Sequence, residues 1–256
     1  MEAGLNLFSI RNLIATPEGY LETAHKLKDM GYTCLQHSGA AFDPDLLVRV
    51  TEETGLPVVL THVPMDRILH DTDALMREHE RCNCRNIGLG AMPREAIYDE
   101  ENMKKTVAEL DAAAARMESA GFRFFYHHHH FEFFKTSEGR TVLDYMIECA
   151  PHIRFTLDTY WVQYGGGDIA ATAEKLKGRI ACVHLKDYRI AWNAEKKEFT
   201  PVFAPVGDGN IDFARLVPVL KACGAEHFLV EQDNAAAAAD PLGEVARSIR
   251  YIKNNL

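Results

Sequence analysis

Short apolar runs recur along the chain, and each is followed by a segment whose apolar residues fall three and four positions apart. The runs are rich in β-branched and aromatic residues, which is typical of parallel strands buried on both faces. They predict eight strands, which begin at Gly4, Tyr32, Pro57, Arg85, Arg123, Ile153, Ile180 and His227.

The segments between these runs predict amphipathic helices. The clearest is Glu100–Gly121, which ends in a glycine that suits the left-handed backbone after a helix. Further helices are predicted at Pro17–Met30, Asp43–Thr54, Ile169–Lys177 and Phe213–Cys223. A glycine between a helix and the next strand recurs in "DMGYT", "ETGLP", "SAGFR" and "ACGAE". This repetition indicates an alternating βα chain.

Eight such units with no change of composition predict an α/β fold, a single-domain (β/α)8 TIM barrel over residues 1–256. A doubly wound parallel sheet of similar length is the alternative. No glycine-rich phosphate loop follows the first strand, and this absence favours the barrel.

Net charge, apolar stretches and cysteine usage indicate which partners and which cellular compartment are expected. The net charge of -9 argues against a surface built for nucleic acid. No stretch approaches the roughly 20 apolar residues of a membrane span, and the N-terminus does not resemble a signal peptide. The six cysteines contain no CxxC pair, so reduced thiols in the cytoplasm are expected; a redox or metal pair at Cys82 and Cys84 is the less favoured interpretation.

Polar side chains gather where the predicted strands end, which is where a barrel of this kind carries its active site. They are Arg11, His37, His62, the run His127–His130 with Glu132, Asp158, His184, Lys186, Glu231 and Asp233. A single residue of this kind is more often a cap or a solvated loop residue. Carboxylates and imidazoles converging from several strands instead predict one divalent cation, Mn²⁺, Mg²⁺, Co²⁺ or Zn²⁺. Without a cation the buried carboxylates would repel each other.

The four consecutive histidines cannot all be equivalent ligands, because side chains alternate along a strand. His127 and His129 are expected on one side, and His128 and His130 on the other. One pair is therefore expected to face the site while the other packs away from it.

Several motifs together resemble the xylose-isomerase-like superfamily of TIM barrels. The motifs are "LFSIRNL" from Leu7, "YHHHHFEF" from Tyr126, "FTLDTYWVQYGGGD" from Phe155, "VHLKD" from Val183, "PVGDGNIDF" from Pro205 and "LVEQDN" from Leu229. This superfamily comprises sugar phosphate isomerases and epimerases, and also inosose isomerases and dehydratases and endonuclease IV. The motifs follow the expected order over nearly the whole chain.

The resemblance implies one divalent metal held by a Glu, an Asp, a His and a second Glu. Asp158, His184 and Glu231 match the last three of these ligands. The first glutamate of many members falls at His127 here, whereas members with a Tyr-His-Asn-His-x-x-Glu-Phe-like segment have their nearest carboxylate at Glu132. Glu132 is expected as the fourth ligand, with His127 as the alternative.

The resemblance also implies proton transfer next to a carbonyl, through an enediolate that a divalent cation stabilises. Glu132 and Glu231 are then expected to flank the substrate, and His127 or His129 to move protons. The substrate pocket is expected to contain Arg11, His62, Trp161 and Lys186. Lys186 could instead be a surface lysine paired with Asp187.

The expected activity is that of a sugar isomerase or epimerase, acting on a small keto sugar or inosose, a cyclitol ketone. A dehydratase or lyase acting on a keto sugar or a 3-keto-glycoside shares the first step, and a non-catalytic sugar-binding or accessory subunit is a further alternative. Endonuclease chemistry fits the acidic charge poorly. The "GDGN" segment at Gly207–Asn210 could offer backbone N–H groups to a phosphate, but a turn before the next helix is the favoured interpretation.

The oligomeric state stays open. The aromatic residues Tyr160, Trp161, Tyr164 and Trp192 are predicted in loops on the active-site side. They could stack on a sugar, or a second subunit of a homo-oligomer could cover them.

Overall fold

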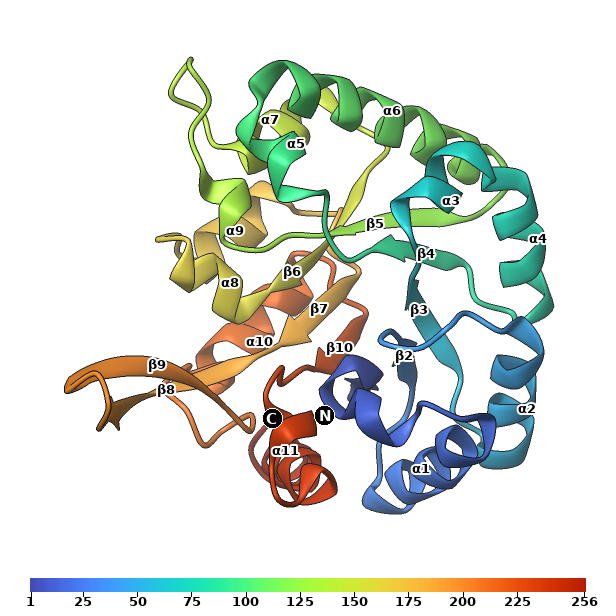
Figure 1. Cartoon of the computed structure of the whole chain (residues 1–256), viewed down its shortest axis with the longest axis vertical. Coiled ribbons are helices and arrows are strands. Elements are labelled where there is room, and N and C mark those ends of the chain that lie inside the picture. The colour runs from blue at the N-terminus through green and yellow to red at the C-terminus, as the bar shows by residue number, and fades with distance from the viewer.

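The computed structural model describes all 256 residues and contains a closed barrel of eight parallel strands (Figure 1). The barrel order is β1-β10-β7-β6-β5-β4-β3-β2, and it closes because β1 pairs with both β2 and β10. The strands are β1 Gly4–Asn6, β2 Leu35–His37, β3 Val58–His62, β4 Asn86–Leu89, β5 Arg123–His127, β6 Arg154–Asp158, β7 Cys182–Leu185 and β10 His227–Val230. The predicted (β/α)8 barrel is confirmed.

Helices surround the barrel as an outer ring (Figure 1). They are α1 Pro17–Met30, α2 Pro44–Thr54, α3 Met65–His70, α4 Thr72–Arg81, α5 Arg94–Tyr98, α6 Glu100–Ser119, α7 Val142–Cys149, α8 Thr159–Tyr164, α9 Ile169–Lys175, α10 Phe213–Ala222 and α11 Pro241–Asn255. Short 3-10 helices lie at η1 Leu7–Leu13, η2 Phe131–Phe133 and η3 Ala235–Ala237. None of the helices combines the length and the apolar character needed to span a membrane.

Local sequence signals set the helix ends. In α1 the Thr16 hydroxyl accepts a hydrogen bond from the Gly19 N–H (3.1 Å), and Pro17 occupies the first turn. The helix ends at Gly31, whose φ of 95° favours glycine over any residue with a Cβ.

The barrel has an apolar layer directly beneath its C-terminal mouth. Leu60, Phe125, Cys182 and Leu229 are completely buried members of one small cluster, and each lies two residues before a polar residue at or next to the C-terminal end of its strand. Because side chains alternate along a strand, those polar residues also point inward, one layer higher. The fold therefore places the polar site on an apolar floor.

Two predicted strands differ from the structure. The first strand ends at Asn6, because the Asn6 side chain accepts from the Phe8 N–H (3.2 Å) and starts the 3-10 helix η1, which carries Arg11. The chain after β7 leaves the barrel as an antiparallel hairpin, β8 Asp187–Asn193 and β9 Glu198–Ala204, which projects from one side (Figure 1).

Candidate functional site

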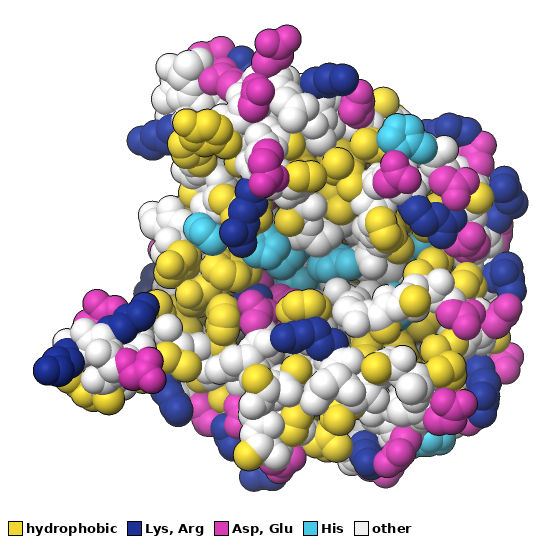
Figure 2. Space-filling model, in the orientation of Figure 1, with side chains coloured by type: hydrophobic (Ala, Val, Ile, Leu, Met, Phe, Trp, Pro, Cys, Tyr) yellow, Lys and Arg dark blue, Asp and Glu magenta, His cyan; other side chains and the backbone are white.

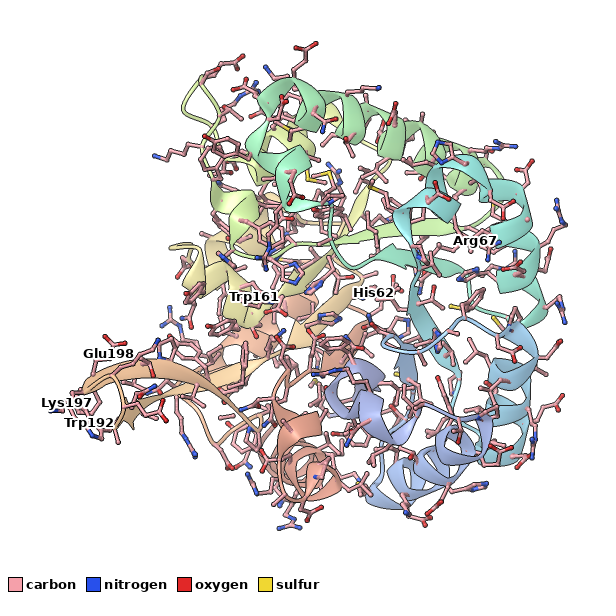
Figure 3. The ribbon with its side chains drawn as sticks, viewed as in Figure 1. His62, Arg67, Trp161, Trp192, Lys197 and Glu198 are labelled. Atoms are coloured by element: carbon pink, nitrogen blue, oxygen red, sulfur yellow. The ribbon has the colours of Figure 1, made fainter.

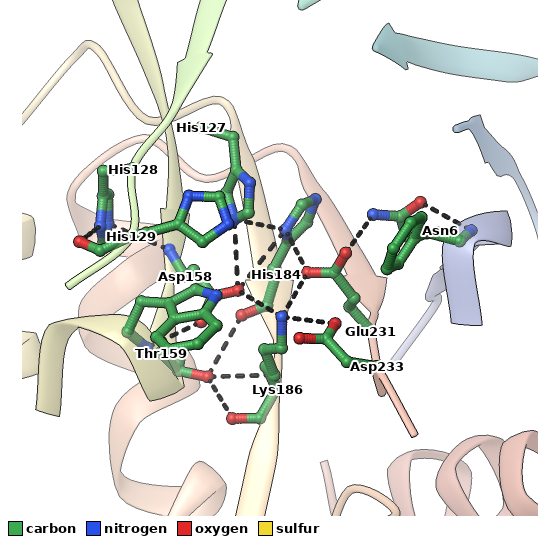
Figure 4. Close-up of polar contacts among 12 residues, drawn as sticks. Asn6, His127, His128, His129, Asp158, Thr159, His184, Lys186, Glu231 and Asp233 are labelled. Atoms are coloured by element: carbon green, nitrogen blue, oxygen red, sulfur yellow. Dashed lines mark hydrogen bonds and ion pairs between the residues drawn. The ribbon is translucent and has the colours of Figure 1, made fainter. Parts of the chain in front are cut away.

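Four residues from neighbouring strands converge at the mouth of the barrel (Figure 4). His127 ends β5, Asp158 ends β6, His184 lies in β7 and Glu231 follows β10. Each is buried and offers one ligand atom, and these atoms all lie within 4.8 Å of one another. This group, called here the ligand cluster, could hold a metal ion.

The contacts within the ligand cluster are close. The Nδ1 atom of His184 lies 2.9 Å from Oε2 of Glu231 and 3.2 Å from Nε2 of His127. The Oδ2 atom of Asp158 lies 3.3 Å from Nε2 of His127 and 3.7 Å from Nδ1 of His184. Two imidazole nitrogens and two carboxylate oxygens therefore surround one point, and this donor set suits a divalent cation.

Both imidazoles are oriented by their outer nitrogens. Nδ1 of His127 lies 3.2 Å from the Gly90 carbonyl, and Nε2 of His184 lies 2.7 Å from Oε1 of Gln36. Each outer nitrogen faces an acceptor and must donate its N–H there, so a neutral ring directs a lone pair into the cluster. The Gln36 amide is itself fixed, because its Nε2 lies 3.0 Å from Nε2 of His62. This second layer fits metal ligation and was not predicted from the sequence.

Each carboxylate uses one oxygen as an anchor and presents the other to the cluster. Oε1 of Glu231 accepts from the Asn6 amide (2.7 Å), while its Oε2 faces the cluster. Oδ1 of Asp158 accepts from the Trp161 backbone N–H (2.9 Å), while its Oδ2 faces the cluster. Burial raises the pKa of both carboxyls, but Lys186 and the neighbouring imidazoles outweigh it, so both pKa values lie below the ordinary range.

The same carboxylates also shift the pKa values of the neighbouring imidazoles. Burial lowers the pKa of His184, but Glu231 and Asp158 more than offset it and raise that pKa to about 9. Burial and His184 lower the pKa of His127, so this imidazole is neutral near pH 7. One ring therefore already carries a free lone pair, while the other exchanges a proton for a cation.

Lys186 is a buried cation beside the cluster, with 1% of its side chain exposed. Its Nζ lies 2.7 Å from Oδ1 of Asp233, 3.1 Å from Oε2 of Glu231 and 3.6 Å from Oδ2 of Asp158. Burial lowers its pKa, but the three carboxylates raise it above the ordinary value. The interpretation of Lys186 as a surface lysine paired with Asp187 is wrong.

Asp187 instead holds the "GDGN" segment. Its carboxylate accepts from the backbone N–H groups of Gly207 (2.9 Å), Gly209 (3.0 Å) and Ile211 (3.2 Å). A Cβ at Gly209 would lie 2.2 Å from Oδ1 of Asp187, so only glycine permits this approach. These N–H groups are committed within the protein, and the segment is a turn before α10 rather than a phosphate cradle.

The structure does not bring Glu132, the expected fourth ligand, to the ligand cluster. Its Oε1 accepts from the Tyr126 hydroxyl (2.5 Å) and its Oε2 from the His129 backbone N–H (2.7 Å). The reason is that β5 ends at His127 and the chain turns into η2, which directs the Glu132 carboxylate back beneath the turn. His127, the alternative, occupies the fourth position.

The histidine run follows the predicted alternation only at its start. Nε2 of His128 accepts from the Asp158 backbone N–H (3.2 Å), on the side away from the cluster. His129 and His130 both line the cavity described below, although they were expected on opposite sides. Strand pairing ends at His127, and His130 has a helical backbone (φ -74°, ψ -26°), so the two-residue period no longer applies.

A cavity of about 390 Å³ opens above the cluster, and Figure 2 shows histidine side chains gathered in this hollow. Its lining residues are Phe8, Ser38, His62, Gly90, Arg94, His127, His129, His130, Phe131, Trp161, Lys186, Glu231 and Asp233. His62 and Trp161, which were expected here, lie at the barrel mouth in Figure 3.

Arg11 is absent from the cavity lining. Its guanidinium donates to the backbone carbonyls of Phe8 (2.8 Å) and Asp233 (3.2 Å), so it supports the loop after β10. Arg94, at the start of α5, contributes an arginine to the lining instead, and no feature of the sequence pattern indicated it.

Residues 24–255 match the family of xylose isomerase-like TIM barrels. The chain belongs to this family. The resemblance seen in the motifs is thereby confirmed. This family member is 35% identical over 106 residues to the inosose dehydratase of Geobacillus thermodenitrificans (strain NG80-2). The match covers 38% of the chain and 36% of the relative, so it spans about a third of that relative's length.

Solved structures share the barrel at lower identity. A sugar phosphate isomerase/epimerase from Parabacteroides distasonis ATCC 8503 superposes with a TM-score of 0.81 at 18% identity, over 98% of this chain and 93% of that one. A xylose isomerase-like barrel protein from Mycobacterium smegmatis, in complex with magnesium, superposes with a TM-score of 0.73 at 13% identity, over 99% of this chain and 95% of that one. At these identities the likeness establishes the fold alone.

This barrel carries two further groups suited to proton transfer at the cavity. Burial raises the pKa of Asp233 to about 6, with Glu231 adding to the shift and Lys186 opposing it. Burial and His127 lower the pKa of His129, whose ring centroid lies 4.5 Å from that of His127. A neutral imidazole and a carboxyl with a pKa near neutrality therefore face the same space.

Proposed function

We propose that this chain is a divalent-metal-dependent isomerase or epimerase that acts on a keto sugar or an inosose through an enediolate. The observation that carries this proposal is the buried cluster of His127, Asp158, His184 and Glu231 beside a polar cavity. A cavity of about 390 Å³ leaves room for a six-carbon sugar or cyclitol together with a few waters.

The residues of the ligand cluster would hold the cation through one atom each. When bound, a divalent cation of the Mn²⁺, Co²⁺, Zn²⁺ or Mg²⁺ kind supplies the positive charge that stabilises an enediolate. The protein's part is to hold these donors in place, and the hydrogen bonds from Asn6 and to Gln36 and Gly90 do so.

Two groups that line the cavity, His129 and Asp233, would transfer the protons. His129 has a neutral ring and Asp233 has a pKa of about 6, so one of them can accept the α-proton and the other return one. Lys186 would donate a hydrogen bond to a substrate oxygen, and Trp161 would cover one face of the ring. Glu132 takes no direct part here; it holds the backbone of His129 in position.

A dehydratase or lyase is the second candidate, favoured by the identity to an inosose dehydratase over 106 residues. Both reactions begin with removal of the proton next to the carbonyl. In the dehydratase the β-hydroxyl then takes a proton from Asp233 and leaves as water, whereas in the isomerase a proton returns to carbon.

Hydrogen exchange at carbon tests the step that both candidates share. We would strip the protein of metal, add Mn²⁺, Co²⁺ or Zn²⁺, and incubate it with inososes and keto sugars in D₂O. NMR is expected to show deuterium entering the carbon next to the carbonyl only when metal is present. Glu231→Gln should abolish the exchange, while Glu198→Gln, an exposed carboxylate on the β8–β9 hairpin, should leave it unchanged.

The products of the same incubation separate the candidates. An epimer or an isomer without loss of water supports the first proposal, whereas a product that has lost one water, as a 1,2-diketone or its enol, supports the dehydratase. Wild-type protein that binds metal but exchanges no hydrogen would instead favour a sugar-binding accessory protein. Wild-type protein that binds none of these metals would contradict the proposed mechanism.

A further inference from the structure

The ammonium of Lys186 contacts the same two oxygens that the ligand cluster presents to a cation. Oε2 of Glu231 lies 3.1 Å from Nζ, and Oδ2 of Asp158 lies 3.6 Å from it (Figure 4). The opposite oxygens of both carboxylates are engaged by Asn6 and by the Trp161 N–H. Lys186 and a divalent cation would therefore draw on one pair of oxygens.

Lys186 has little freedom to leave the site. Its backbone N–H donates to the Thr159 hydroxyl (3.0 Å), and its Nζ lies 5.0 Å and 5.2 Å from the ring centroids of Trp161 and Phe203. With 1% of its side chain exposed, Lys186 is buried except where it lines the cavity above the cluster. These contacts hold the ammonium close to the cluster.

Asp233 gives the ammonium of Lys186 an ion-pair partner outside the ligand cluster. Its Oδ1 lies 2.7 Å from Nζ, the shortest of the three carboxylate contacts of Lys186. Asp233 lies on the loop after β10 and is 26% exposed, outside the ligand cluster. A cation could therefore take the inner oxygens while Lys186 keeps one close carboxylate partner.

We propose that Lys186 acts as a built-in counter-ion of the metal site. In the metal-free chain its charge, together with that of His184, holds Asp158 and Glu231 in place. A divalent cation has to share these oxygens with it, so Lys186 weakens metal binding, and Asp233 lessens this penalty by attracting the ammonium. The inference rests on the proposed metal site.

Metal affinity of the variants tests this role without any measurement of activity. We would titrate Mn²⁺ and Zn²⁺ into metal-free protein by calorimetry, comparing wild type with Lys186→Met and Lys186→Gln. Both variants remove the charge, and the second keeps a hydrogen-bond donor. Each is expected to lower Kd about tenfold or more, because a positive charge next to the cation is lost. Lys175→Met, which removes an exposed lysine paired with Asp144, should leave Kd unchanged.

Asp233→Asn supplies the complementary test. The variant should raise Kd in the wild-type background, because Lys186 then binds the cluster oxygens of Glu231 and Asp158 more tightly. In the Lys186→Met background the same change should raise Kd much less, since only the direct attraction between Asp233 and the cation is lost. This difference is the coupling that a double-mutant cycle measures.

Metal-free stability gives a second readout. Without the ammonium, His184 alone balances two buried carboxylates, so the melting temperature of Lys186→Met should fall below that of wild type without metal and recover when metal is added. If Lys186→Met does not fold, Lys186→Gln carries both measurements. A Kd that rises or stays unchanged in the folded Lys186 variants would overturn the inference while leaving the metal site intact. Failure of wild type to bind metal would overturn the proposed function, and with it this inference.

Discussion

Each member of the ligand cluster has one polar atom in the cluster and another tied to a fixed partner outside it. The outer partners are a side-chain amide for Glu231, a backbone N–H for Asp158, a backbone carbonyl for His127 and a side-chain amide oxygen for His184. Such outer contacts set the direction of each lone pair before a cation arrives. Removing one of them should therefore weaken binding without removing a ligand.

Gln36 offers the clearest case at the residue scale. In Gln36→Leu, Nε2 of His184 loses its acceptor and His62 loses its amide partner, so the His184 ring is free to rotate. We expect Kd for Zn²⁺ or Mn²⁺ to rise about 10–100-fold, measured by calorimetry. Gln163→Leu, at an exposed glutamine of α8, is the control. An unchanged Kd for Gln36→Leu would show that His184 needs no outer partner.

His127 is the residue whose replacement best tests the metal preference of the proposed site. It provides an imidazole where the family resemblance implies a glutamate, so the cluster has two nitrogen and two oxygen donors. Imidazole suits Zn²⁺ and Co²⁺, whereas Mg²⁺ prefers oxygen. We expect His127→Glu to lower the ratio of the Kd for Mg²⁺ to the Kd for Zn²⁺ by about tenfold or more, measured on metal-free protein. An unchanged ratio would mean that the other three ligands determine the preference.

The sequence was sufficient to predict that Asp158, His184 and Glu231 converge, because strand ends in a barrel meet at one mouth and a two-residue period fixes which side chains point inward. The amides Asn6 and Gln36 carry no such signal, since a neutral polar residue in a strand does not reveal its partner. The choice between Glu132 and His127 depended on where β5 ends, and strand ends are set by pairing with neighbours far along the chain.

At the scale of elements, the turn from β5 into η2 depends on the Glu132 carboxylate. It joins the Tyr126 hydroxyl to the His129 backbone N–H and is completely buried. Burial raises its pKa from 4.5 to about 7, although both hydrogen bonds oppose the shift. The folded chain therefore binds this proton more tightly than the unfolded chain does.

The pH dependence of the free energy of unfolding should reveal protonation of Glu132. The protonated Glu132 contributes fully to the free energy of unfolding below about pH 4.5. That contribution is lost as the pH rises through about 7, because the folded-state pKa is higher than the unfolded-state pKa. The free energy of unfolding of wild type, relative to that of Glu132→Gln, should therefore fall by about 3 kcal/mol between pH 4.5 and 8. Urea denaturation at several pH values measures it, with Glu195→Gln, an exposed glutamate, as control. A constant difference would show that burial does not raise the pKa of Glu132 above its value in the unfolded chain.

Element boundaries were predictable where the sequence carries a stop signal. The helix predicted at Glu100–Gly121 is α6 Glu100–Ser119, and Gly121 adopts the expected positive φ of 79°. The β8–β9 hairpin had no such signal, because the apolar run from Ile180 continues into Asp187 with no glycine or proline at the barrel exit. A hairpin without a covered apolar face also lacks the pattern of a buried strand.

The outer part of this hairpin should be dispensable for the site. Ile190, Trp192 and Phe199 are 52%, 54% and 71% exposed there, whereas Tyr188 and Phe203 at its base pack edge-on against Tyr160. Figure 3 shows Trp192 well away from the barrel mouth.

Replacing residues 191–200 by Asn-Gly keeps the base of the hairpin and provides a tight turn. We expect Kd for Zn²⁺ to stay the same and the melting temperature to move by less than about 2 °C, because no barrel residue depends on the removed part. Calorimetry and thermal unfolding measure both. A large loss of stability would mean that this segment is covered, and sedimentation of the intact chain would then show a second copy.

At the scale of the whole molecule, the site exists only when the barrel is closed. Its supporting amide Asn6 lies on β1 and its ligand Glu231 follows β10, at opposite ends of the sequence, and these two strands pair to close the sheet. The ligands come from β5, β6, β7 and β10, which are consecutive in the barrel order. A bound cation would therefore connect four neighbouring strands at their C-terminal ends.

Metal removal should consequently lower the stability of the entire fold. The unfolded chain cannot gather ligands spread from His127 to Glu231, so a cation at about 100 times its Kd stabilises the folded state by about 2.7 kcal/mol. For a chain of this size that is a rise in melting temperature of about 5–10 °C, which a chelator should reverse. Glu231→Gln should show almost no rise, while Glu198→Gln should behave as wild type. A wild-type melting temperature that changes with neither metal nor chelator would mean that the four residues converge for a structural reason, with His184 and Lys186 balancing the two carboxylates.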